Sequence, residues 1–84
     1  MKLYIATIVK HDEYFISHDR TFTAKSAEEL ANQVYEYLVE ETPADYESIL
    51  IECTNGNEKG EPLSQVVDED LCHEWLIFTS IVEL

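Results

Sequence analysis

The chain has 84 residues, of which 45% are apolar, and this composition excludes a disordered chain and fits one domain. Eighteen acidic residues against five basic ones give a formal net charge of −13. Such acidity excludes direct binding to nucleic-acid phosphates or to an anionic membrane surface, because like charges repel, whereas a basic protein surface is compatible with it.

Two strands are predicted at the start of the chain. Residues 2–9 are rich in β-branched and aromatic side chains, which favour a strand. His11 and Asp12 form a short polar break, and residues 13–24 predict a second strand. In that strand four apolar residues share one parity: Tyr14, Ile16, Phe22 and Ala24. The short connection predicts an antiparallel hairpin.

A helix is predicted to begin at Ser26. Ser26 and Glu29 match a capping box, in which the serine oxygen and the glutamate carboxylate bond to free amide groups at the helix start. Five apolar residues recur at helical spacing and form one stripe: Ala27, Leu30, Ala31, Val34 and Leu38. Thr42–Pro43 ends the helix, because the residue before a proline avoids helical geometry.

The second half of the chain predicts two more strands. Residues 48–53 are expected to form the third strand, and the turn-rich stretch 55–62 is expected to be exposed. Residues 63–67 fit either a strand or a short helical turn. Residues 75–82 predict a last strand that is central in the sheet, because apolar residues occupy both parities. A helix over residues 71–78 stays open as the alternative.

The predicted fold is therefore a single α+β domain over residues 1–84. One helix packs on a four-stranded antiparallel or mixed sheet, in the order strand, strand, helix, strand, strand. An additional short helix near residues 63–73 stays open.

The charge is concentrated in one part of the sequence. Residues 1–25 carry a net charge of +1, and residues 26–84 carry −14 with Lys59 as their one base. Glu36 and Glu40 are one helical turn apart, so their side chains are neighbours that repel each other slightly. We expect an acidic face that binds a basic partner through these residues: Glu29, Glu36, Glu40, Asp45, Glu47, Asp68, Glu69 and Asp70. The simpler alternative is an acidic surface that is merely solvated.

Catalytic and metal-binding motifs are incomplete. His11–Glu13 has the H-x-E pattern of zinc deaminases but lacks the P-C-x-x-C partner. Cys72, His73 and Glu74 are possible metal ligands, but consecutive side chains in a strand point to opposite sides. The acidic run Asp68–Asp70 lacks the glycine and the final glutamate of an EF-hand loop. We therefore expect no catalytic residue, no metal site, no cofactor and no enzymatic activity.

Cysteine usage and the N-terminal residues predict a cytoplasmic protein. Cys53 and Cys72 are expected to remain thiols that pack as small apolar side chains. The apolar run of residues 1–9 is too short for a signal peptide, and no run is long enough to span a membrane. Among the aromatic residues, Tyr37 and Tyr46 are candidate apolar anchors beside the acids, although packing against the sheet is the more favoured role for Tyr37.

A hairpin that leads into a Ser-Ala-Glu-Glu-Leu-Ala helix at residues 26–31, in a tiny acidic domain, resembles the small inhibitors that bacteriophages encode against host defence. Anti-CRISPR proteins and other DNA mimics are the groups it resembles. The resemblance covers the general character of the whole chain and rests on no signature motif, so it transfers no residue. It implies a viral, non-enzymatic inhibitor in the host cytoplasm that fills a basic DNA or RNA channel of a nuclease or CRISPR effector complex. Some members of those groups instead block a nuclease recruitment surface or force dimers.

Two rival functions remain from the residues alone. One is a structural or regulatory interaction module whose acidity serves only solubility, with a homodimer formed through a sheet edge or an apolar patch. The other is a small hydrolase or metal enzyme, which would be indicated by a stoichiometric metal in the purified protein.

Overall fold

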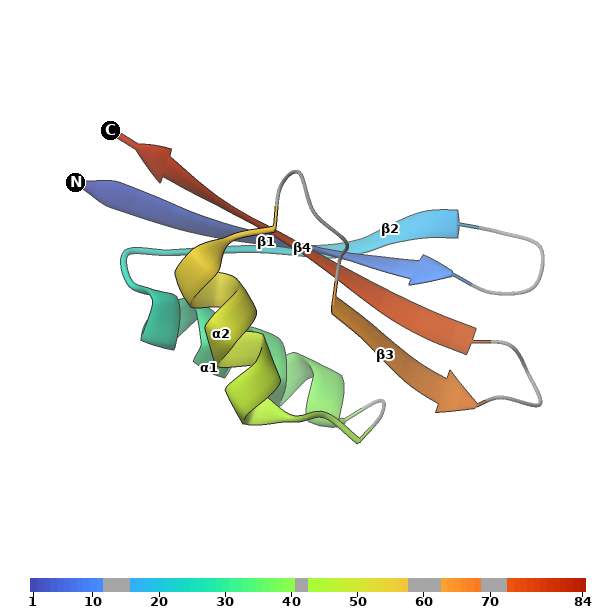
Figure 1. Ribbon diagram of the computed structural model, residues 1–84. Coiled ribbons are helices and arrows are strands. Elements are labelled where there is room, and N and C mark those ends of the chain that lie inside the picture. The colour runs from blue at the N-terminus through green and yellow to red at the C-terminus, as the bar shows by residue number, and fades with distance from the viewer. Residues whose placement is uncertain (12–15, 41–42, 58–62, 69–72) are drawn as a thin grey trace.

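The computed structural model describes residues 1–11, 16–40, 43–57, 63–68 and 73–84, with the backbone alone at residues 64–68 and 73. Figure 1 shows six elements in chain order: β1 (Lys2–His11), β2 (Ile16–Ala24), α1 (Ala27–Val39), α2 (Tyr46–Asn55), β3 (Leu63–Asp68) and β4 (His73–Glu83). The strands form one antiparallel sheet in the order β2-β1-β4-β3, and both helices cover the same face of it (Figure 1).

The predicted α+β class, the N-terminal hairpin and the central position of the last strand are confirmed. β1 pairs with β2 from Tyr4 to His11, and β4 lies between β1 and β3. The alternative helix over residues 71–78 is wrong from residue 73 onward, because β4 begins there, and residues 71–72 lie outside the described residues. The first strand runs two residues further than predicted, to His11.

The first helix forms as its sequence predicts. The Ser26 Oγ accepts a hydrogen bond from the Glu29 backbone amide at 3.2 Å, which satisfies one of the free donors of the first turn. The apolar stripe is buried at four positions: Leu30, Ala31, Val34 and Leu38. The helix ends with Glu40 as its C-cap, and the predicted stop at Thr42 lies outside the described residues.

The predicted third strand over residues 48–53 is wrong, because this segment belongs to the second helix. Tyr46, Ile49 and Cys53 recur at helical spacing and give α2 an apolar face that packs on α1 and the sheet. The order is therefore strand, strand, helix, helix, strand, strand, and the predicted ββαββ order is wrong. The ambiguous stretch 63–67 belongs to β3, so the additional short helix that stayed open there is also wrong over residues 63–68.

Asn57 connects α2 to the sheet, although the stretch 55–62 was expected to be exposed. Gly56 has φ of 73°, a conformation that glycine adopts without strain, and it turns the chain toward β4. The buried Asn57 side chain donates to the Ile77 carbonyl at 2.9 Å and accepts from the backbone amide of Thr79. The prediction is therefore wrong at Asn57, and residues 58–62 lie outside the described part.

A β-bulge at Asp19 changes which side chains of β2 share a face. Arg20 pairs with Ile8 and His18 pairs with Val9, so Asp19 is an extra residue opposite the break in register. The bulge reverses the alternation, so Phe22 lies on the helix-covered face and Ile16 on the other face. The prediction that Ile16 and Phe22 lie on the same side of the strand is wrong for this reason.

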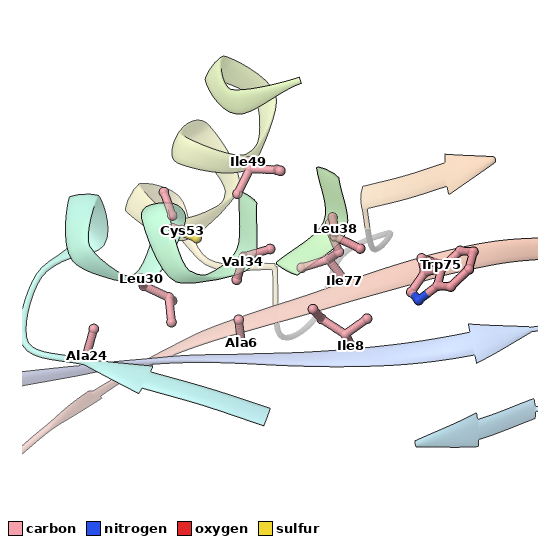
Figure 2. Packing of buried hydrophobic residues seen from close by; sticks show 11 residues of the cluster. Ala6, Ile8, Ala24, Leu30, Val34, Leu38, Ile49, Cys53, Trp75 and Ile77 are labelled. Carbon is pink, nitrogen blue, oxygen red and sulfur yellow. The ribbon is translucent and has the colours of Figure 1, made fainter. Parts of the chain in front are cut away.

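The core lies between the sheet and the two helices (Figure 2). Figure 2 shows Ala6, Ile8 and Ile77 of the central strands facing residues of both helices. Cys53 of α2 is buried there as a free thiol, which confirms its packing as a small apolar side chain. Cys72 lies outside the described residues. Across the described ranges, neither helix has the length and apolar character needed to cross a membrane.

Candidate functional site

The two helices and their caps form the most acidic part of the described structure. Residues 26–57 contain eight acidic residues and no lysine or arginine. We use the name acidic helical layer for the described carboxylates of this segment: Glu28, Glu29, Glu36, Glu40, Asp45, Glu47 and Glu52. The two helices that carry these carboxylates cover one face of the sheet, so the side of the helices away from the sheet forms a face of the whole molecule (Figure 1).

The α1 carboxylates are held outward because the opposite side of the helix is buried. Successive residues of a helix are about 100° apart, which puts Glu29, Glu36 and Glu40 on the side opposite the buried residues of the stripe. All three glutamates are exposed. Among the described residues, none of these three carboxylates forms an ion pair. Their negative charges are therefore uncompensated on the helix, as the sequence predicts for this side.

Asp45 and Glu47 bring further charge to the start of α2. Asp45 is the N-cap of α2, and its Oδ2 accepts a hydrogen bond from the Ser48 hydroxyl at 2.6 Å. Glu47 is exposed in the first turn, where the partial positive charge of the helix N-terminus stabilises a carboxylate. Glu40 and Asp45 are five residues apart, so the connection keeps them within about 18 Å. The structure thus places five of the predicted acids on the two helices and their caps.

Of the other three predicted acids, the structure describes only the backbone of Asp68. Asp68 ends β3 in the sheet, where it pairs with His73 of β4, and its side chain is not described. Glu69 and Asp70 lie outside the described residues. The acidic site that the structure describes is consequently limited to the helices and their caps, and a role of Asp68, Glu69 and Asp70 stays a prediction.

Two of the cations lie on aromatic rings rather than among the helical acids. The Arg20 guanidinium lies 5.2 Å from the ring centre of Tyr37, and the Lys10 ammonium lies 5.2 Å from that of Trp75. Such cation–π contacts hold the charges beside the hairpin, on β1 and β2. Arg20 therefore lies against α1 itself, but among the described residues neither cation forms an ion pair with a carboxylate of that helix.

Sequence reasoning missed a polar cluster that joins three elements around Asp19. The Asp19 carboxylate accepts hydrogen bonds from the Tyr37 hydroxyl and, at 3.3 Å, from the Trp75 indole nitrogen. Burial and the hydrogen bond to Asp19 raise the pKa of Tyr37, which keeps its hydroxyl protonated as a donor. The signal was hidden, because only the β-bulge turns Asp19 toward the helix.

The aromatic candidates pack within the fold. Tyr37 contacts Phe22 with ring centres 5.8 Å apart, which agrees with the packing role favoured for it. Tyr46 makes an edge-to-face contact with Tyr35 at 5.6 Å, so it joins α2 to α1. Apolar side chains that do face solvent from the helices are Val39 and Ile51, exposed by 47% and 58%. Ile51 was missed because its segment was assigned to a strand.

Neither a metal site nor a similarity to known proteins assigns a function to the described structure. Over the ranges that the structure describes, no group of three histidine, cysteine, aspartate or glutamate residues is placed to hold a metal ion. Comparisons with protein-family models, curated proteins and solved structures find no match. The functional argument therefore depends on the geometry and charge of the chain itself.

Proposed function

We propose that this protein is a non-enzymatic inhibitor that docks its acidic helical layer on a basic, nucleic-acid-binding surface of another protein and so blocks access of DNA or RNA. The observation that carries the proposal is the row of exposed, unpaired carboxylates on α1, in a segment without lysine or arginine. A CRISPR effector complex or another host nuclease is the class of target that the acidic character suggests.

Charge spacing supports the choice of a nucleic-acid-binding surface. The Cβ atoms of Glu36 and Glu40, one turn apart, are separated by about 5–6 Å, a distance of the same order as that between successive phosphates of a strand. A groove lined with lysine and arginine would attract such a row from a distance and speed the encounter. The acidic layer would then occupy the positions that phosphates fill.

Apolar contacts would add binding that salt does not screen. Val39 and Ile51 are exposed on the same two helices that carry the acids. In protein interfaces, a central apolar contact surrounded by polar groups supplies much of the affinity, while charge supplies specificity and association rate. The two helices carry both kinds of side chain.

A displacement experiment tests the blocking function. The immobilised protein captures basic proteins from a bacterial lysate, and each captured protein is then titrated with this protein while bound to labelled DNA or RNA. We expect release of the nucleic acid as the protein is added. Joint binding of both, with no release, would contradict blocking and would favour the interaction module whose acidity serves only solubility.

A matched pair of variants places the effect on the helical layer. Glu36→Lys and Glu83→Lys change the net charge equally, but Glu83 lies at the end of β4 and contacts the N-terminal ammonium at 3.5 Å on the surface. We expect Glu36→Lys to weaken displacement and Glu83→Lys to leave it nearly unchanged. Equal losses in the two variants would assign the effect to total charge.

A further inference from the structure

On the side opposite the helices, no described element covers the sheet, and its two central strands are mainly apolar there. Neither helix lies on this side (Figure 1). The register of β1 and β4 places alternate residues of the two central strands side by side on this face. We use the name open sheet face for these residues: Leu3, Ile5, Thr7, Val9, Leu76, Phe78, Ser80 and Val82. Phe78 and Val82 are exposed by 38% and 40%.

The composition of this face differs from that of an ordinary solvated sheet face. An antiparallel sheet with one wet face usually carries polar side chains there. On β1 and β4 this side is mainly apolar, whereas the edge strand β2 adds Ile16 and the polar residues His18, Thr21 and Thr23. Among the described side chains on this side of the three strands, lysine and arginine are absent, and the one acid is Glu74. Glu74 lies at the end of the sheet, 3.8 Å from the His11 ring nitrogen. An apolar surface of this kind marks an interaction site.

We propose that the open sheet face binds a second copy of this chain, sheet against sheet, about a twofold axis. Charge decides the occupant. Two copies with a net charge of −13 each repel one another through the acidic helical layer, whereas the open sheet face is nearly neutral. Packing these faces together points both acidic layers away from the contact, on the outer sides of the dimer (Figure 1).

The size of the face is sufficient for a specific dimer. The four strands contain 10, 9, 6 and 11 residues. With a rise of about 3.3 Å per residue and about 4.8 Å between strands, the sheet covers about 600 Å². A contact that uses the whole side of both sheets, with the outer strands β2 and β3 included, buries about 1,200 Å² in total, which is at the lower limit of stable interfaces and fits a dimer of about micromolar affinity. The two central strands, which carry the open sheet face, supply a little more than half of that area.

The salt dependence separates this inference from the proposed function. The dimer contact is apolar and the two copies repel each other, so added salt should tighten it by screening the repulsion. Binding of the acidic layer to a basic surface should instead weaken with salt. The two contacts lie on opposite sides of the sheet, so either can fail without the other.

Sedimentation equilibrium of the full chain at about 50 mM and about 500 mM NaCl measures the dimerisation constant over the range in which charges become screened. We expect a monomer–dimer equilibrium whose dissociation constant falls at the higher salt concentration. A protein that stays monomeric at a concentration of about 1 mM would overturn the inference, because even a weak specific contact is populated there. A monomer that binds another protein through this face would also overturn it.

Variants locate the contact. Phe78→Lys places a charge at the centre of the open sheet face, and we expect it to raise the dissociation constant by about 100-fold or more, since each dimer contains two such positions. Thr7→Lys, at the paired position on β1, is a second variant that retains Phe78. Ile51→Lys on α2 is the matched control and should dimerise as the wild type does. Far-ultraviolet circular dichroism confirms folding. Unchanged dimers in both face variants would overturn the inference and indicate pairing through a strand edge.

Discussion

At the scale of single residues, Asn57 shows how one side chain can complete a sheet. Its backbone amide donates to the Thr79 carbonyl at 2.9 Å, while its side chain donates to the Ile77 carbonyl and accepts from the Thr79 amide. The Thr79 hydroxyl bonds in turn to the Glu52 carbonyl at the end of α2, at 2.9 Å. Asn57 thus continues the ladder of β4 beyond the start of β3 and fixes α2 to it.

Replacing Asn57 should be strongly destabilising. Asn57→Ala leaves the Ile77 carbonyl and the Thr79 amide buried without their partner, so we expect the free energy of unfolding to fall by about 3 kcal/mol. Urea denaturation followed by tryptophan fluorescence measures it. Asn55→Ala, at an exposed position of α2, is the control and should change stability by less than about 0.5 kcal/mol. A similar small change for Asn57→Ala would contradict the role given to its side chain.

Burial of the Cys53 thiol gives a second prediction at this scale. Desolvation, with the nearby Glu52 carboxylate, raises the pKa of Cys53 from 9.0 to about 11. The folded state therefore favours the neutral thiol. Burial of the neutral thiol contributes its full stability below pH 9, and this contribution is lost as the pH rises through 11, because the unfolded protein ionises its thiol first. The raised pKa of Tyr37 acts in the same direction at high pH.

Thiol reactivity and alkaline unfolding both measure this effect. In a Cys72→Ser background, the native Cys53 thiol should react with iodoacetamide at least about 100-fold more slowly at pH 8 than the same thiol in urea, because little thiolate forms. Urea stability should decline between pH 9 and 11, and Cys53→Ala should reduce the decline. Equal reactivity of the native and unfolded thiols would refute the burial argument.

At the scale of elements, the two helices differ in how far local sequence specifies them. For α1, the capping pair Ser26 and Glu29 and an apolar stripe at helical spacing are both local signals, and the prediction was correct. For α2, the continuous apolar run Ile49–Ile51 fits a strand as well as a helix. The decisive residues are Tyr46 and Cys53 at its ends, which complete a helical face only when the segment packs on α1.

The Ser26 cap should stabilise the helix that carries Glu28, Glu29 and Glu36. Ser26→Ala removes the acceptor for the Glu29 amide, so we expect a loss of about 1 kcal/mol in the free energy of unfolding. Ser26→Asp should restore most of it, because aspartate accepts the same hydrogen bond. Urea denaturation compares the three proteins. A loss that Ser26→Asp fails to restore would show that the hydrogen bond is not what the serine contributes.

Strand pairing explains what the sequence could not reveal about the sheet. The apolar residues on both parities of residues 75–82 correctly indicate a central strand, with Trp75 and Ile77 toward the helices and Phe78 on the open sheet face. The bulge at Asp19 depends on the register with β1, and no local residue pattern indicates it. The Asp19 cluster and the altered side of Ile16 were unpredictable for that reason.

At the scale of the whole molecule, the sheet separates two surfaces of different character. One side carries the acidic helical layer, and the opposite side carries the open sheet face. The outward acids of α1 were predictable from helical periodicity, because Glu36 and Glu40 follow from the stripe itself. Asp68 was assigned to the acidic face on charge alone; its backbone ends β3, its side chain is not described, and its place in the acidic face stays a prediction.

This separation leads to a molecule that could bind two partners of different chemistry. The outward helical side is suited to a basic surface, and the open sheet face to an apolar one. In a dimer joined through the open sheet faces, the two acidic layers would face away from each other. Such a dimer could engage two basic surfaces at once, with a gain in apparent affinity where the target presents both.

The association rate with a captured basic partner, measured for the wild type, Glu36→Lys and Glu83→Lys from about 50 to about 500 mM NaCl, tests the central claim most directly. We predict that the wild-type rate falls steeply with salt, that Glu36→Lys lowers it at low salt by about tenfold, and that Glu83→Lys stays close to the wild type. A rate that does not change with salt, or equal effects of the two substitutions, would contradict docking through the acidic helical layer.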